Sequence, residues 1–255
     1  SSEEIHARVG RQLAEAASVY SVDAELLESL RPTHIVTQVH CEVCAVSLGD
    51  VRAAVHGSAT AAAEIVALGA STLAQALEDM ERVAASLAVP ARGTGVTSRL
   101  RARMNGIAAA AAPLPRPRVL TIEWLAPLMA AGNWIPQMIE MAGGENLAGE
   151  TGRHSPWLET GALDALDPDV IAVFPCGFSL ERTESEMRRL AEASGLAGTR
   201  AALEGRLFLA DGNQFFNRPG PRLVESLEMF AEMLHPEKFD FGHGRTSWRP
   251  WPAAD

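Results

Sequence analysis

The sequence lacks the features that define several large classes of protein. It has three cysteines among 255 residues, an odd number that is too small for a disulfide framework. No segment approaches the ~20 apolar residues that a membrane-spanning helix needs. Its 22 basic residues are outnumbered by 32 acidic ones, and the net charge of −10 argues against a nucleic-acid-binding surface. We therefore expect no nucleic-acid partner and no membrane insertion.

Catalytic and targeting motifs are missing as well. The chain has no G-x-S-x-G, no phosphate-binding loop and no G-x-G-x-x-G after an expected strand, so we expect no enzyme. Most acidic residues fall on expected helix faces, where exposure to solvent is the default. Residues 1–5 lack the basic region and apolar core of a signal peptide, which predicts a cytoplasmic protein as the sequence stands. Removal of an N-terminal segment would instead make it periplasmic or otherwise extracytoplasmic.

One pattern occurs twice in the chain. At residues 30–44 and again at residues 166–176, a helix ends in leucine, a proline stands two positions later, and a short run with β-branched residues leads to a cysteine loop. Proline stops a helix, and the run is long enough for one buried strand. Open α/β sheets hold their ligands at the carboxyl ends of their strands. The repeat therefore predicts two α/β lobes, each with a cysteine loop at that edge.

The remaining pattern alternates helices and strands, which is typical of α/β proteins with mostly parallel sheets. Asp23 is expected to cap the helix that leads into the first strand. We expect helices over residues 2–17, 24–30, 47–55, 71–87, 94–112, 134–141, 163–166, 180–194 and 219–234. We expect strands in the run after Pro32 and over residues 63–68, 118–123, 170–174 and 206–210, with an irregular tail up to residue 255.

The predicted architecture is two Rossmann-like lobes joined by one long backbone helix. We place an N-terminal α/β lobe at residues 1–90, the linking helix at 91–116 and a C-terminal α/β lobe at 117–255. The first lobe has only about two expected strands, fewer than a stable sheet needs. We therefore expect that the N-terminal part of that lobe is missing from this sequence.

The order of several short motifs resembles a known family, the helical-backbone (class III) substrate-binding proteins of ABC importers. The motifs are residues 30–32, CEVCAVS at 41–47, EWL at 123–125, GGEN at 143–146, PCGF at 175–178 and DGNQFFNRPGPR at 211–222. The likeness covers nearly the whole chain and is greatest to the cobalamin-binding branch, here with a Cys-x-x-Cys variant. It implies a periplasmic-binding-protein-like fold, a ligand held between two lobes, transport through an ABC permease, and no catalysis.

The resemblance also concerns docking to a permease. Relatives that dock carry one glutamate on each lobe, and Glu25 matches the first of these. The second matching position holds Gly161, with Glu159 nearby. The docking pair implied by the family is therefore incomplete in this chain.

Aromatic and polar residues at expected strand ends are the candidate ligand contacts, since flat faces suit a large planar ligand such as a corrin. The resemblance implies ligand contacts for Trp157, Phe216 and Arg218, and for Met129 where a relative has phenylalanine. An arginine can donate a fork of hydrogen bonds to an amide, carboxylate or phosphate. Strand-end aromatics can equally be core residues, and Asp211 and Asn213 can either contact ligand or only shape their turn. The candidates are Trp124, Met129, Trp157, Phe178, Asp211, Asn213, Phe216 and Arg218.

The three cysteines are a second candidate site. Cys41 and Cys44 have a spacing shared by zinc sites, redox dithiols and small turns, and Cys176 lies on the matching loop of the repeat. Together they suit zinc or another soft metal, or the metal of a bound ligand. The alternative is that they are small buried hydrophobic residues.

The sequence thus predicts a non-enzymatic binding protein for a corrinoid, a cobalamin-like ligand of tetrapyrrole size. Two alternatives stay open. One is a cytoplasmic metal or metal-cluster protein that uses the cysteines, and the other is a ferric-siderophore or haem binding protein.

Overall fold

The computed structural model describes residues 1–15, 21–39, 46–56, 60–159, 161–244 and 246–252. These residues divide into two compact units. Unit 1 comprises residues 1–2, 71–73 and 99–255, and unit 2 comprises residues 3–70 and 74–98. The lobe boundaries expected at residues 90 and 116 stay a prediction. None of the helices in the described residues is long and apolar enough to cross a membrane.

Unit 2 is built on two parallel strands, β1 (His34–Gln38) and β2 (Glu64–Leu68), which is the number that the sequence predicts. Its helices are α2 (Ala24–Leu30), α3 (Leu48–Val55) and most of α1 (Ser2–Glu15) and α4 (Leu73–Ser86). The α2 helix begins where expected, because the Asp23 side chain accepts a hydrogen bond from the backbone N–H of Leu26 at 2.9 Å.

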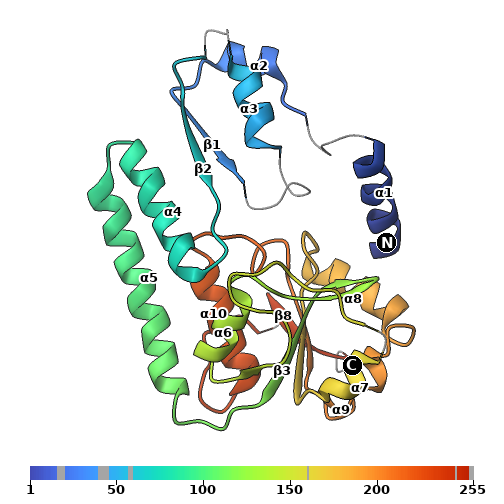
Figure 1. Ribbon diagram of the computed structural model, residues 1–255. Helices are drawn as coiled ribbons and strands as arrows, with labels where there is room; N and C mark the ends of the chain where they lie inside the picture. The colour runs from blue at the N-terminus through green and yellow to red at the C-terminus, as the bar shows by residue number, and fades with distance from the viewer. Residues whose placement is uncertain (16–20, 40–45, 57–59, 160, 245, 253–255) are drawn as a thin grey trace. The chain divides into compact units, whose positions relative to one another are not determined.

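Unit 1 contains a six-stranded, mostly parallel sheet in the order β4-β3-β6-β7-β8, with β5 beside β3. Its strands β3 and β8 are labelled in Figure 1. Strands β5 and β6 run parallel to β3, and β7 runs parallel to β6. Strand β4 runs antiparallel to β3, and β8 runs antiparallel to β7. The strands are β3 (Arg118–Leu125), β4 (Leu128–Ala130), β5 (Glu145–Asn146), β6 (Val170–Val173), β7 (Leu207–Ala210) and β8 (Trp248–Trp251). The predicted α/β class with mostly parallel sheets is therefore confirmed.

The repeated pattern has the same local structure in both copies. Arg31 follows α2 with φ 45°, and Asp167 follows α7 (Ala162–Leu166) with φ 38°. Both residues lie in the left-handed region that ends many helices. A proline comes next in each copy, and β1 or β6 begins two residues after it.

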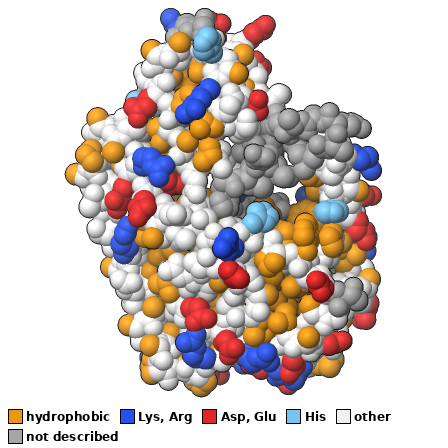
Figure 2. Space-filling view, in the orientation of Figure 1, with side chains coloured by type: hydrophobic (Ala, Val, Ile, Leu, Met, Phe, Trp, Pro, Cys, Tyr) orange, Lys and Arg blue, Asp and Glu red, His pale blue; other side chains and the backbone are white. Residues whose placement is uncertain are grey.

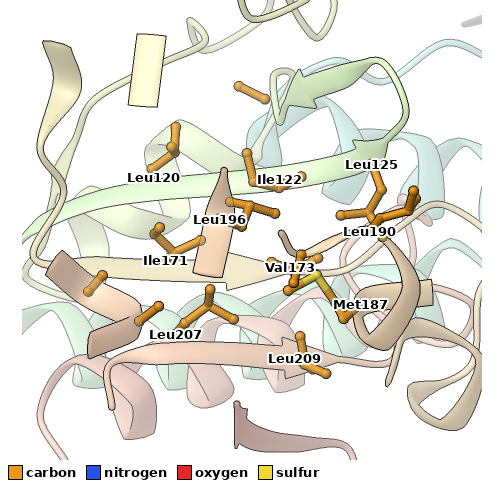
Figure 3. Packing of buried hydrophobic residues seen from close by; sticks show 14 of the residues in the cluster. Leu120, Ile122, Leu125, Ile171, Val173, Met187, Leu190, Leu196, Leu207 and Leu209 are labelled. Carbon is orange, nitrogen blue, oxygen red and sulfur yellow. The ribbon is translucent and has the colours of Figure 1, made fainter. Parts of the chain in front are cut away.

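One hydrophobic core cluster of unit 1 lies on one face of this sheet (Figure 3). Alternate residues of the central strands point toward the same layer, as the pleat requires. They meet α8 (Leu180–Leu190), the 3₁₀ turn η1 (Leu196–Gly198) and α9 (Arg200–Leu203). The labelled side chains are Leu120, Ile122, Leu125, Ile171, Val173, Met187, Leu190, Leu196, Leu207 and Leu209.

Two further helices, α6 (Ile135–Met141) and α10 (Leu223–Leu234), pack against each other. Every residue of α10 except Glu225 is buried, so the expectation that acidic residues are solvated is wrong for Glu228 and Glu232. Glu228 pairs with Arg103 at 2.6 Å and with His243 at 2.9 Å. Buried carboxylates need such partners.

The C-terminal tail also differs from the prediction, because it is not wholly irregular. Residues Trp248–Trp251 form β8, which pairs with β7. Glu232 holds this tail by accepting a hydrogen bond from the indole N–H of Trp248 at 2.6 Å. The helix expected from residue 219 begins only at Leu223.

The long predicted helix is α5 (Pro90–Ala111), 22 residues in one continuous piece. Its first nine residues belong to unit 2 and the rest to unit 1. Within unit 2 it lies close to α4, because a Cβ atom at Gly93 would collide with the Cβ atom of Ala84. Within unit 1, Arg103 of α5 forms the ion pair with Glu228.

Candidate functional site

Three predicted ligand residues come together across neighbouring chain segments of unit 1. Trp124 of β3 lies opposite Met129 of β4, and Met129 forms an isolated bridge with Trp157. Residues directly opposite in antiparallel pairs project from the same face. A β-bulge between Ile122 and Trp124 re-aims the end of β3, as bulges commonly do. We call Trp124, Met129 and Trp157 the Trp–Met–Trp row.

The row offers apolar surface to solvent, since the side chain of Trp157 is 52% exposed and the other two are half-buried. Hydrogen bonds hold the Trp157 segment along β4 on both sides, from Ala130 N to Pro156 O and from Leu158 N to Leu128 O, each 2.9 Å. Figure 2 shows hydrophobic side chains gathered on the surface where Figure 1 places β3 and α8.

Phe178 supports the row from behind. Its ring centroid lies 5.5 Å from that of Trp124 in an edge-to-face arrangement, and its side chain is only 2% exposed. A ring with so little exposed surface contributes by holding Trp124 in place.

The loops that follow β3, β6 and β7 are tied together at the carboxyl edge of the sheet. Cys176 N donates to Glu123 O at 3.1 Å, Gly177 N donates to Gly212 O at 3.3 Å, and Asn213 N donates to Phe178 O at 3.0 Å. This is the edge where open α/β sheets bind ligands. The exposed Cys176 therefore lies at the place that the sequence predicts.

Arg218 is exposed and held by Asn213. Its Nε atom donates to Asn213 O at 2.5 Å, and its Nη2 atom donates to Asn213 Oδ1 at 3.0 Å. Asp211 in turn is buried and shapes the turn, because its Oδ1 accepts from the backbone N–H groups of Asn213 at 2.9 Å and Gln214 at 2.8 Å. Of the two roles that the sequence left open for Asp211, this geometry supports the shaping of the turn.

Phe216 lies in the core. Its side chain has no exposed surface, its ring stacks on Phe174 at 4.4 Å and meets Phe230 edge-to-face at 5.1 Å. The backbone has φ 59°, a strained conformation for a large residue. The indole N–H of Trp134 donates to Phe216 O at 2.6 Å and Ser226 Oγ accepts from Phe216 N at 3.0 Å. Direct contact with a ligand would require the ring to leave this packing.

A carboxyl group with unusual properties lies beside the row. Burial raises the pKa of Glu123 from 4.5 to about 7, against the hydrogen bond from Ser155 and the charge of His154, which both lower it. The motif Glu-Trp-Leu at residues 123–125 suggested Trp124 as a ligand contact. Nothing in the motif indicated that Glu123 would have a raised pKa.

Sequence reasoning also missed Arg182 of α8. Its guanidinium carbon lies 3.8 Å from the ring centroid of Phe178, a cation–π geometry. The four-residue spacing of an aromatic residue and an arginine around the Ser179 cap was the available signal.

The remaining candidates belong to unit 2 or lie outside the described residues. Glu25 is exposed in the first turn of α2, in unit 2. Cys41 and Cys44 lie outside the described residues. In the part of the chain that the structure does describe, no three His, Cys, Asp or Glu side chains are grouped to hold a metal ion. The proposed three-cysteine site thus stays a prediction.

Comparison with known proteins tests the resemblance. A scan of known protein families finds no model that matches the chain. A protein of Halobacterium salinarum named cobalamin-binding protein is 29% identical over 149 residues, which are 57% of this chain and 40% of that protein. The chain thus covers less than half the length of this curated relative.

Solved structures match over a larger part. A periplasmic heme-binding protein from Roseiflexus sp. RS-1 superposes with a TM-score of 0.68 and 25% identity, covering 86% of this chain and 81% of that one. The periplasmic vitamin B12 binding protein of Vibrio cholerae superposes with a TM-score of 0.63 and 17% identity, covering 84% and 78%. The resemblance to class III substrate-binding proteins is confirmed. These relatives are named as binding proteins and not as enzymes, in agreement with the predicted absence of catalysis.

Proposed function

We propose that this chain is a non-enzymatic binding protein for a tetrapyrrole-sized ligand, with a corrinoid as first candidate. The Trp–Met–Trp row carries the proposal, because it sets two indole rings and a thioether on one partly exposed face at the carboxyl edge of the sheet. Such rings suit stacking on a planar macrocycle. The names of the Halobacterium relative and the Vibrio structure support a corrinoid.

In this proposal Trp124, Met129, Trp157 and Arg218 contact the ligand. Phe178, Asp211, Asn213 and Phe216 hold those residues in position, as their burial and hydrogen bonds favour. Cys176 lies near enough to the same edge to border the ligand.

Haem is the second candidate ligand. It is favoured by the Roseiflexus structure, which is named as heme-binding and has 25% identity to this chain. We also propose that the protein serves uptake through an ABC permease, with Glu25 as a docking residue of unit 2. That role places the protein outside the cytoplasm.

The test is an absorbance titration of the purified protein with cyanocobalamin and, separately, with haemin. We expect a saturable band shift with one of them, and a loss of about tenfold or more in affinity in Trp157→Ala, since aromatic contacts dominate such interfaces. Leu203→Ala is the matched control, because Leu203 is an exposed apolar residue of α9, just before the amino end of β7. No saturable shift with either compound, or equal losses in both variants, contradicts the proposal.

A further inference from the structure

Arg182 is fixed against the aromatic cluster. It lies in the first turn of α8, and its guanidinium group covers the ring of Phe178 at 3.8 Å. The ring of Trp124 meets the same Phe178 ring at 5.5 Å. A stacked guanidinium keeps its hydrogen-bonding edge available while the apolar contact limits its motion. Arg182 is exposed, so that edge faces solvent.

Arg218 is held at the adjoining loop. Two of its nitrogen atoms are fixed by Asn213, and Asn213 N donates to Phe178 O at 3.0 Å. The ring of Phe178 thus contacts Arg182, and the carbonyl of Phe178 accepts a hydrogen bond from Asn213, which binds Arg218. Both guanidinium groups are therefore placed around one aromatic residue at the ligand edge of the sheet.

The acidic residues that lie near these two arginines in the sequence contact other groups. Glu181 lies 3.9 Å from Arg249, and Glu184 pairs with Arg188 at 2.5 Å and Arg249 at 3.1 Å. Asp211 accepts from the backbone of its own turn. Neither Arg182 nor Arg218 forms an ion pair with any carboxylate of the described residues, in a chain whose net charge is −10.

Two other arginines of unit 1 contrast with this pair. Arg200 binds Asp167 and Asp169 at 3.0 and 2.9 Å, and Arg222 binds Glu225 at 3.1 Å. Both of these guanidinium groups are therefore neutralised within the chain. Arg182 and Arg218, in contrast, present two positive charges at the ligand edge of the sheet, where an acidic group of a ligand can reach them.

We infer that Arg182 and Arg218 bind acidic substituents of the ligand, carboxylate or phosphate, while its ring lies against the Trp–Met–Trp row. Guanidinium groups recognise both anions by paired hydrogen bonds. Because the two side chains are already ordered by Phe178 and Asn213, little conformational entropy is lost on binding. The inference rests on the proposed function and adds the class of ligand: a tetrapyrrole with acidic side groups, in preference to a wholly amidated or esterified one.

Matched ligand pairs test this inference and separate the two anions. Haemin carries two carboxylates that haemin dimethyl ester lacks, and cyanocobalamin carries a phosphate that dicyanocobinamide lacks. Affinities are measured by absorbance titration for wild type, Arg182→Ala, Arg182→Lys, Arg218→Ala and the control Arg188→Ala. Arg188 lies on the same helix and pairs with Glu184.

We expect wild type to prefer the acidic member of at least one pair by about tenfold or more. Arg182→Ala and Arg218→Ala should remove most of that preference, Arg182→Lys should keep part of it, and Arg188→Ala should keep all of it. The preference should also shrink as salt concentration rises, because exposed charges are screened. A preference for haemin over its ester identifies carboxylate. A preference for cyanocobalamin identifies phosphate only if Arg182→Ala or Arg218→Ala removes it, because dicyanocobinamide lacks the whole nucleotide and not the phosphate alone.

Two results overturn the inference in distinguishable ways. If the acidic and neutral compounds of each pair bind with equal affinity, or if Arg182→Ala lowers the affinity for both compounds equally, the arginines do not recognise an acidic group. The proposed tetrapyrrole binding would still hold in that case. If none of the four compounds gives a saturable shift, the proposed function fails and the inference fails with it.

Discussion

Glu123 gives the sharpest test of the local electrostatics. It precedes Trp124 at the end of β3, with its carboxyl beside Ser155 and His154. Ser155 Oγ also accepts from Gly132 N at 3.1 Å, so the loop that carries Trp157 is fixed at the same point. Burial raises the pKa of Glu123 from 4.5 to about 7 because desolvation disfavours the charged carboxylate.

The direction of the effect on stability follows from the protons bound in each state. Between pH 4.5 and about 7 the folded protein holds a proton on Glu123 that the unfolded chain has lost. Stability from this group is therefore complete below pH 4.5 and falls as pH rises through about 7. At 1.36 kcal/mol per pH unit, the loss is at most about 3 kcal/mol, and solvent at the partly exposed side chain reduces it.

Glu123→Gln isolates this contribution, since the amide has a similar shape and does not titrate. We expect wild type and variant to be about equally stable at pH 4, and the variant to be more stable at pH 8 by up to about 3 kcal/mol. Urea unfolding followed by near-ultraviolet circular dichroism measures both. Glu145→Gln, an exposed change in β5 of the same sheet, is the control and should show no such gain. A difference between wild type and Glu123→Gln that is the same at both pH values refutes the reasoning.

Two further predictions concern packing. Phe216→Ala removes a buried ring stacked on Phe174 and should lower the free energy of unfolding by about 3–5 kcal/mol. Trp157→Ala, at a half-exposed residue, should lower it by less than about 1 kcal/mol. Similar urea midpoints for the two variants would contradict the assigned roles. Gly212→Ala places a Cβ atom against the backbone carbonyl of Phe174 and should cost about 2–3 kcal/mol, while Gly198→Ala meets nothing within 4 Å and should leave the midpoint nearly unchanged.

Much of the fold follows from local signals in the sequence. Leu-x-Pro at residues 30–32 and 166–168 predicts a helix end and a following strand, because proline removes a backbone donor and restricts its neighbour. Both copies behave this way. The long α5 could be expected from high helix propensity over residues 94–112, although its start at Pro90 shows how a proline in the first turn extends a helix.

The parts that the sequence did not predict depend on distant partners. Strand β8 contains Pro250, which argues against a central strand, and the structure places β8 at the edge of the sheet, antiparallel to β7, where proline is tolerated. In the sequence, Glu228 and Glu232 have the pattern of solvated helix residues. In the structure, Arg103, which lies 125 positions before Glu228, pairs with that residue, and the tail around Trp248 binds Glu232. Helical periodicity alone cannot report such coverage.

The candidate site shows the same division. The resemblance brought together Met129 and Trp157, and strand-end position added Trp124, and these three do form one row. Phe216 was expected beside them from the resemblance and from its place after a strand, but its left-handed backbone turns the ring into the core against Phe174 and Phe230. No periodicity in the sequence marks a single residue with positive φ.

Burial therefore separates the residues that can meet a ligand from those that place them. Asp211 has 5% exposure and uses both carboxylate oxygens within its own turn, yet that turn presents Asn213 to Arg218. A change at Asp211 thus reaches the ligand only through Arg218. In a double-mutant cycle, the effect of Asp211→Ala on the affinity for an acidic tetrapyrrole should largely vanish when Arg218→Ala is already present, because residues acting through one another are not additive. Fully additive losses in affinity would mean that Asp211 contacts the ligand itself.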